Sequence, residues 1–149
     1  MDRFAMSFKL GYVSKEDEVL IMDSQRYQHP LNSLSSCTSI EDIRLIRKAA
    51  ADIRISDELK RYIVDIVAQT RTTPGVAMGA SPRAGITLMK ASQALALMEG
   101  VDFVTPDHIQ ELAIPSIAHR LILESGSQYS GSQAAQILLE IIQDIPVPA

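Results

Sequence analysis

Tryptophan is absent from the chain, and aromatic side chains make up only 5% of its 149 residues. Apolar residues still reach 46%, so a hydrophobic core can form, chiefly from alanine, isoleucine and leucine. This composition favours packed helices over a β-sandwich, because alanine and leucine are strong helix formers. A chain of this length supports one domain, or a small domain with additional segments.

Cysteine is nearly absent as well. The single Cys37 excludes an internal disulfide framework and is compatible with a reducing cytosol. Residues 1–10 lack the long apolar core of a signal peptide, and no apolar run approaches the length of a membrane span. We therefore expect a cytoplasmic protein that does not enter a membrane.

The patterns that build catalytic and metal centres are missing too. The sequence contains no G-x-x-x-x-G-K-[ST] loop to bind phosphates and no apolar run ending in paired acids to hold Mg²⁺. His29, His108 and His119 lack metal-type spacing with cysteine, so no metal site is predicted. No serine or cysteine stands in a recognisable nucleophile motif. We therefore expect the chain by itself to be catalytically inactive.

Basic residues are outnumbered, 14 against 18 acidic ones, which gives a net charge of −4. The densest basic stretch, from Arg44 to Arg61, is interrupted by Asp52, Asp57 and Glu58. This mixture favours a solvated helix face over a nucleic-acid patch. A stand-alone helical module that binds protein or nucleic acid remains the alternative function.

Helical signals cover most of the chain. Helices are predicted to begin after Ser14, Ser39, Ser56, Ser81 and Thr105, and near Ser132. Pro82 and Pro106 then occupy first helical positions, which proline favours. Pro115 is expected to end the fifth helix at about Ala113.

Two of these helices carry predicted core faces. Apolar residues recur at helical spacing in the third helix, at Leu59, Tyr62, Ile63, Ile66 and Val67. In the fourth helix the predicted apolar seam consists of Leu88, Ala91, Leu95 and Met98.

The first residues follow a different period. Apolar and polar or small residues alternate from Phe4 to Leu10, which predicts a β-strand that Gly11 ends. One strand cannot satisfy its own backbone hydrogen bonds, and no second clear strand follows. The sequence therefore predicts that the chain begins in the middle of a sheet and is a fragment of a longer protein.

Arg83 is the candidate binding residue, at the second position of the helix that follows Ser81 and Pro82. A helix N-terminus suits an anion, and a guanidinium adds bidentate phosphate geometry. A positive side chain is nevertheless unfavourable beside the same helix dipole. A phosphate ligand and an ordinary surface arginine therefore both remain open. Arg3, taken alone, indicates little.

Together these segments resemble MoxR-family AAA+ ATPases. Asp2-Arg3-Phe4 and Gly11-Tyr12-Val13-Ser14 resemble that family's "DRF" and "GYPS", and residues 79–84 its "GASPRA" sensor-2 motif. Further matches, in the family's order, are Ala91 to Leu97 with Glu99-Gly100 ("A-x-A-L-x-G"), residues 102–109 ("D-Y-V-T-P-E-D-V") and Ala118-His119-Arg120-Leu121. The departures are mild, with Val13 for proline, Phe103 for tyrosine and Gly85 inside the sensor helix.

The resemblance implies a mainly α fold, a helical AAA+ lid bundle preceded by a single β-strand left over from the α/β core. Residues 1–13 would be the core stub, 14–38 a connecting helix and Ser-rich loop, and 39–149 the lid. Arg3 would be an arginine finger acting in trans, and Arg83, with Ser81, would bind the phosphates of ATP.

For the parent protein the resemblance implies ATP, Mg²⁺ and ATP hydrolysis, used for chaperone-like remodelling or cofactor insertion. It also implies a hexameric ring and von Willebrand A-domain partner proteins. No nucleic-acid partner is expected.

Overall fold

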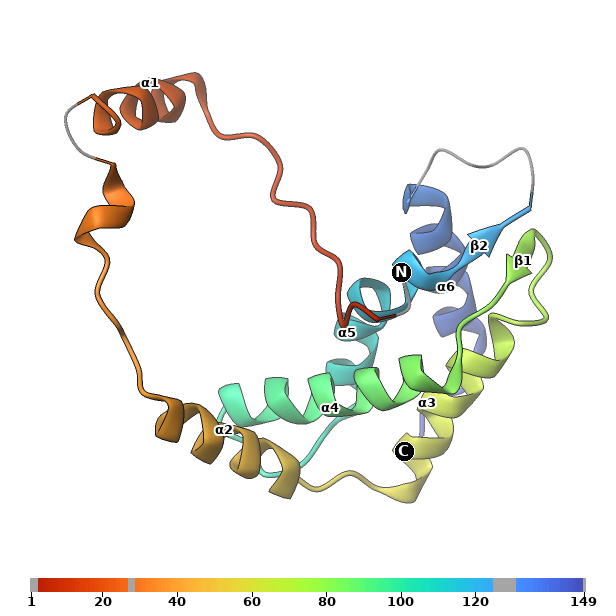
Figure 1. The fold of residues 1–149 in the computed structure, drawn as a ribbon. Coiled ribbons are helices and arrows are strands. Elements are labelled where there is room, and N and C mark those ends of the chain that lie inside the picture. The colour runs from red at the N-terminus through yellow and green to blue at the C-terminus, as the bar shows by residue number, and fades with distance from the viewer. Residues whose placement is uncertain (1–2, 27–28, 125–130, 149) are drawn as a thin grey trace. The chain divides into compact units, whose positions relative to one another are not determined.

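The computed structural model describes residues 3–26, 29–124 and 131–148. It divides the chain into two compact units, one made of Met1–Ser7 with Ile46–Ala149, and one of Phe8–Leu45. The described residues are mainly helical, with one small two-stranded sheet, so the predicted mainly α fold is confirmed (Figure 1). Asp2 of the "DRF" motif and most of the polar stretch between Glu124 and Gly131 lie outside the described residues.

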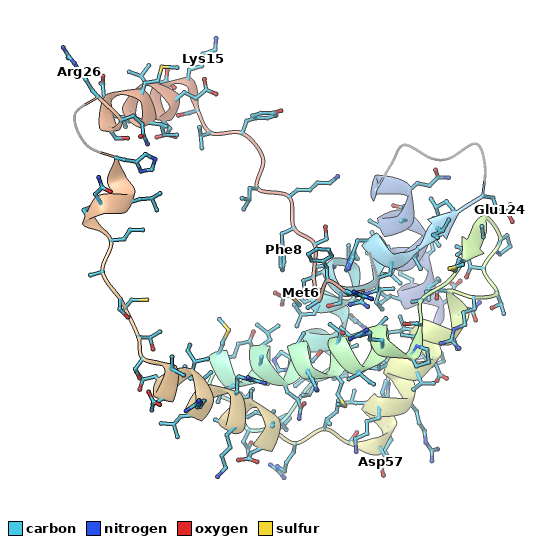
Figure 2. The ribbon with its side chains drawn as sticks, in the orientation of Figure 1. Met6, Phe8, Lys15, Arg26, Asp57 and Glu124 are labelled. Carbon is cyan, nitrogen blue, oxygen red and sulfur yellow. The ribbon has the colours of Figure 1, made fainter. Side chains whose placement is uncertain are left out.

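The smaller unit contains α1 (Lys15–Ser24), a 3₁₀ turn η1 (Pro30–Ser33) and the start of α2 (Ile40–Asp52). Ser14 caps α1 as predicted, because its Oγ accepts the amide of Asp17 at 3.1 Å. No residue of α1 or α2 is buried, and Figure 2 shows the side chains of α1 spread around the helix between Lys15 and Arg26. Local capping, rather than packing, therefore defines these helices within the chain.

The larger unit holds the core. It consists of α3 (Asp57–Gln69), α4 (Pro82–Met98), α5 (Pro106–Ile117), the 3₁₀ turn η2 (Ala118–Arg120) and α6 (Gly131–Asp144). All five residues of the apolar stripe predicted for the third helix are buried in α3. They pack with apolar residues of the other helices, notably Leu88, Ile109, Ile117 and Leu138, which are fully buried.

Two short strands lie outside the sequence prediction. β1 (Val76–Met78) pairs antiparallel with β2 (Ile122–Leu123), with Val76 opposite Leu123 and an irregular register between Val76 and Met78. Strands of two or three residues are too short to show an alternating pattern, so only the tertiary contact reveals them.

The strand predicted for residues 4–10 is wrong. Residues 4–10 have no strand conformation in the structure. A strand needs a neighbour for its amides and carbonyls, and the partners here are helical. The amide of Ser7 donates to the carbonyl of Pro115 in α5 at 2.9 Å.

The predicted end of the fifth helix is also wrong. α5 continues through Pro115 to Ile117. Pro115 lacks only the amide that would reach back one turn, while the amide of Ala118 still donates to the carbonyl of Ile114. The proline therefore removes one hydrogen bond from the last turn without ending the helix.

The buried face of α4 differs from the predicted seam. Met98 is 83% exposed, whereas Ala84, Leu88, Ser92, Gln93 and Ala96 are buried. The two polar members have backbone acceptors, since Gln93 Nε2 donates to the carbonyl of Ile53 at 2.7 Å and Ser92 Oγ to that of His108 at 3.5 Å. An apolar pattern cannot detect polar residues that are buried because they find partners.

Candidate functional site

The start of α4 presents Arg83. Ser81 occupies the N-cap position in an extended conformation, Pro82 is the first helical residue, and the side chain of Arg83 is exposed at the second. The first amides of a helix lack partners inside the helix and carry partial positive charge. Pro82 has no amide hydrogen, and the amide of Ala84 donates to the carbonyl of Ser81 at 2.9 Å. The helix dipole and the exposed guanidinium of Arg83 are therefore what suit an anionic ligand here.

The loop before α4 is held by the end of α3. The hydroxyl of the fully buried Thr70 donates to the carbonyl of Val67 at 2.7 Å and accepts the amide of Ala80 at 2.9 Å. Arg71 Nε donates to the carbonyl of Ala80 at 2.9 Å. Both backbone groups of Ala80 are thus bonded, which sets the position from which α4 begins.

Gly79 makes this close approach possible. A Cβ atom at Gly79 would lie 2.6 Å from the carbonyl oxygen of Thr70 and 2.7 Å from Cα of Arg71. Real Cβ atoms do not approach backbone so closely, so any other residue would push the loop away from α3. The glycine is therefore required by packing, with no need for a positive φ.

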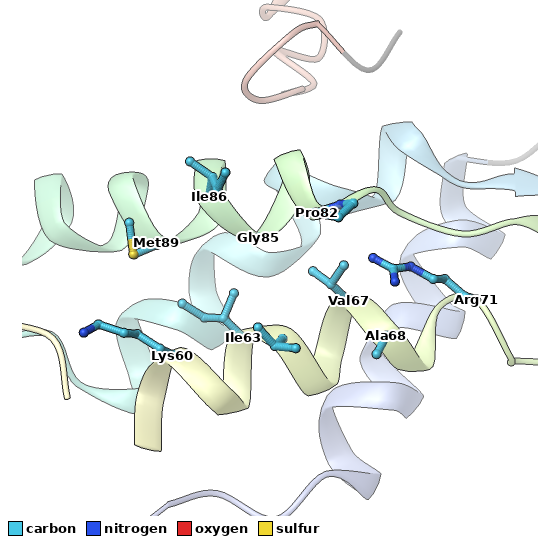
Figure 3. A pocket seen from close by; sticks show the side chains of 10 residues that line it. Lys60, Ile63, Val67, Ala68, Arg71, Pro82, Gly85, Ile86 and Met89 are labelled. Atoms are coloured by element: carbon cyan, nitrogen blue, oxygen red, sulfur yellow. The ribbon is translucent and has the colours of Figure 1, made fainter. Parts of the chain in front are cut away.

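An apolar groove lies between α3 and the first turns of α4, with a cavity volume of about 410 Å³. Figure 3 shows Ile63 and Val67 of α3 opposite Gly85 and Met89 of α4, with the groove open between them. Arg71 lies at one end of the groove, near Pro82, and Lys60, in the first turn of α3, lies at the other end. The groove thus adjoins the start of the helix that carries Arg83.

The segment that carries Arg3 is attached to the end of α5. The carbonyl of Phe4 accepts hydrogen bonds from Arg120 Nη2 at 2.7 Å and from His119 Nε2 at 3.2 Å. The hydrogen bond between Ser7 and Pro115 holds the same segment three residues later. The side chain of Arg3 itself is exposed.

Arg120 connects this segment to α4. It is only 8% exposed, its Nε donates to the carbonyl of Ser116 at 2.8 Å, and Nη2 lies 3.4 Å from the hydroxyl of Thr87. That hydroxyl in turn donates to the carbonyl of Arg83 at 2.9 Å. A continuous series of hydrogen bonds therefore runs from the backbone of Phe4, next to Arg3, to the backbone of Arg83.

The sequence singled out Arg3, Ser81 and Arg83, whereas the residues that position them were missed. Thr70 and Thr87 carry no sequence signal beyond their place on a helix. Arg120 belongs to the His119-Arg120 pair of the family motif, and that pair was the available signal.

The three histidines have separate partners. His108 is nearly buried and accepts the amide of Thr105 on Nδ1 at 2.9 Å, while its Nε2 lies 2.8 Å from Glu99 Oε2. His29 accepts the amide of Leu31, and His119 contacts Phe4. Within residues 3–26, 29–124 and 131–148, no group of three His, Cys, Asp or Glu side chains is placed to hold a metal ion.

The basic stretch is partly neutralised by neighbours. Arg54 pairs with Asp102 at 2.8 Å and Lys60 with Asp57 at 2.9 Å. Arg44 pairs with Glu41 at 3.3 Å. These paired side chains are solvent-exposed. In the part of the chain that the structure describes, no helix is both long and apolar enough to cross a membrane.

Comparison with known proteins gives consistent matches. Residues 68–141 match the family model described as "AAA lid domain". The chain is 38% identical over 148 residues to the Bacillus subtilis protein YeaC, and 28% identical over 156 residues to Chaperone MoxR1 of Mycobacterium tuberculosis. Both alignments cover 99% of this chain but only 46% and 41% of the relatives, so the chain spans less than half of their length.

A crystal structure of a candidate ATPase from Cytophaga hutchinsonii shares the fold, with a TM-score of 0.84 and 28% identity. The match covers 99% of this chain and 48% of that one. The lid-domain match includes the loop before α4, α4 itself and α5, where the hydrogen bonds described above are concentrated. Residues 68–141 therefore form an AAA lid domain, and the chain along its length is similar to MoxR proteins.

Proposed function

We propose that this chain is the lid portion of a longer MoxR-type AAA+ ATPase, in which it senses bound ATP and transmits its state. The observation that carries the proposal is the start of α4, where Arg83 is exposed at the second helical position, directly after a loop held by Thr70, Arg71 and Gly79. An exposed guanidinium at the positive end of a helix dipole suits phosphate oxygens.

The exposed apolar surface of the smaller unit supports a longer protein. Large apolar side chains on α1 and α2 are exposed, among them Leu20 at 65%, Met22 at 71% and Leu45 at 66%. Large apolar side chains exposed in such number favour burial against another part of a protein. In the proposal, the nucleotide-binding core covers it. That core also supplies the acids that hold Mg²⁺, while this chain's own residues contact only the ATP phosphates.

We assign Arg83 the role of sensor 2, with Ser81 beside it, and Arg3 the role of an arginine finger that reaches a neighbouring subunit's ATP. A finger requires self-association, so the proposal includes a ring, a hexamer by family resemblance. The residue ranges 1–13, 14–38 and 39–149 are proposed as core stub, connector and lid. Chaperone-like remodelling or cofactor insertion, von Willebrand A-domain partners and a cytoplasmic location belong to the same proposal.

The test of Arg83 uses the longer protein with its nucleotide-binding core. Arg83→Ala should lower ATP turnover by at least tenfold. Removing one preorganised hydrogen-bond donor that stabilises charge in the transition state typically lowers kcat by a factor on the order of 10²–10³. Lys90→Ala is the matched control, because Lys90 is an exposed cation on the same helix. Turnover in Arg83→Ala equal to that of the Lys90 variant would exclude the sensor-2 role.

The test of Arg3 uses mixed assemblies. Arg3→Ala subunits mixed with Arg83→Ala subunits should regain turnover that neither variant shows alone, because an Arg3→Ala subunit keeps Arg83 at its own site and receives Arg3 from its neighbour. Fingers elsewhere contribute roughly 10³–10⁵ in rate. No gain of turnover on mixing the two variants would instead mean that Arg3 does not act in trans.

A further inference from the structure

We propose that Arg120 is a positioning residue that joins the Arg3 segment to the Arg83 end of α4, so that both arginines move as one unit with the lid. The inference rests on the proposed function for its consequence in ATP turnover. The contact itself rests only on the geometry of residues 3–7, α4 and the end of α5.

The end of α5 supplies the backbone carbonyls to which Ser7 and Arg120 are bonded. The last carbonyls of a helix have no amide one turn ahead, so they need other donors. The carbonyl of Pro115 receives the amide of Ser7, and that of Ser116 receives Arg120 Nε. The end of α5 thus binds both the N-terminal segment, through Ser7, and Arg120, which donates to the same segment at Phe4. A cation is also favourable at this end of a helix dipole.

The guanidinium is suited to bridging because its donors form a rigid, planar fork. Nε is directed to Ser116, while Nη2 reaches Phe4 at 2.7 Å, Ala5 at 3.4 Å and Thr87 at 3.4 Å. With 8% exposure, these bonds are largely shielded from water. A lysine would keep the charge, but its single nitrogen could not take the positions of both Nε and Nη2.

Thr87 extends the contact to Arg83. Its hydroxyl donates to the carbonyl of Arg83 one turn earlier on α4 and lies within reach of Arg120. A displacement of the first turn of α4 would therefore shift Arg120 and, through it, Phe4. Arg3 is bonded covalently to Phe4, so a change at the phosphate-binding end would reach the proposed finger through this series of hydrogen bonds.

The first experiment measures amide hydrogen exchange of the 149-residue chain by NMR. Ser7 reports on the contact because its amide is bonded to Pro115. Arg120→Lys should accelerate exchange at Ser7 by roughly tenfold to a hundredfold, the effect of losing a charge-assisted hydrogen bond. The buried amides of α3 should not change. Unaltered exchange at Ser7 would overturn the proposal.

Two further variants keep the test decisive if Arg120→Lys does not fold. His119→Gln removes or redirects the second donor to Phe4 on a half-buried residue and should accelerate exchange at Ser7 by a smaller factor. Thr87→Val keeps the side-chain shape but removes the hydroxyl, so Ser7 should remain protected. Full protection of Ser7 in His119→Gln, with Arg120→Lys unfolded, would count against the contact.

The second experiment measures ATP turnover of the longer protein. Arg120→Lys should lower kcat with KM for ATP unchanged, and Arg120→Lys combined with Arg3→Ala should be no slower than Arg3→Ala alone. Thr87→Val should lower kcat although Ser7 stays protected. Independent, multiplicative losses in the double variant, or wild-type kcat in Thr87→Val, would contradict the coupling.

The two experiments separate the two proposals. Accelerated exchange at Ser7 with normal turnover in Arg3→Ala would retain the contact and reject the finger. Unaltered exchange at Ser7 with impaired turnover in Arg3→Ala would retain the finger and reject the contact.

Discussion

The amide of Ala80 donates to the hydroxyl of Thr70 at 2.9 Å, and this bond joins the end of α3 to the residue just before the N-cap of α4. Thr70 is fully buried, so the amide has no access to water as an alternative partner. The position of Arg83 is consequently set by a residue thirteen positions earlier, at the C-cap of another helix.

Thr70→Val should therefore destabilise the larger unit. The valine fills the same space but leaves the Ala80 amide buried without an acceptor, at a cost of about 1–3 kcal/mol in the free energy of unfolding. Thr70→Ser, which keeps the hydroxyl and loses one methyl group, is the matched control. Chemical denaturation compares the two. A larger loss in the serine variant would show that packing, and not the hydrogen bond, is the main contribution of Thr70.

Two glycines near Arg83 should respond in opposite directions. Gly79→Ala places a Cβ against backbone atoms of α3 and should cost about 1–3 kcal/mol, as overpacking does. Gly85→Ala places its Cβ at 3.4 Å from Ile63 Cγ2, an ordinary contact, and should stabilise α4 by up to about 1 kcal/mol. Thermal unfolding of both variants checks the pair, and equal effects would contradict it.

Acid should loosen the starts of α2 and α3. Hydrogen bonds from the Ser39 side chain and amide hold the pKa of Asp42 below its usual 3.8, and a hydrogen bond from Lys60 does so for Asp57. Since these folded-state pKa values lie below the unfolded ones, their contribution to stability is present above pH 3.8. It is lost as the pH falls through the lowered values.

The measurement is helicity by circular dichroism and NMR between pH 7 and pH 2. Asp42→Asn and Asp57→Asn should each flatten the acid response of its own helix. Wild-type helix starts that persist unchanged to the lowest pH would contradict the role of these carboxylates.

Ser116→Ala should be neutral or stabilising. The Ser116 hydroxyl is buried and has no hydrogen-bond partner among the described residues, so its removal relieves a desolvation cost on the order of 1 kcal/mol. Ser92→Ala is the control, because Ser92 Oγ has the His108 carbonyl as acceptor and should lose stability. Calorimetry distinguishes the two, and a clear loss in Ser116→Ala would indicate a partner for its hydroxyl.

Much of the fold was predictable because helix starts and stripes are local properties. Ser14 and Ser56 cap their helices through bonds three residues away, and the stripe of α3 needs only the helical period. Pro82 and Pro106 mark first helical turns for an equally local reason. Arg83 could likewise be placed at a helix start from its neighbours alone.

The support of the candidate site could not be predicted, because it depends on groups distant in sequence. The close approach at Gly79 exists only once α3 lies against the loop, and the burial of Ser92 and Gln93 only once their acceptors are present. Residues 4–10 illustrate the same limit. Their alternation predicts a strand, but a strand exists only with a partner, and here the amide of Ser7 bonds to the end of a helix instead.

The sequence by itself thus determined the helix starts, the apolar face of α3 and the place of Arg83, since each depends on residues within one or two turns. The tertiary structure alone decided that Arg120, 116 residues after Phe4, would be buried against its carbonyl. The reason is physical, because hydrogen bonds between distant segments leave no period in the sequence and form only after the helices have packed.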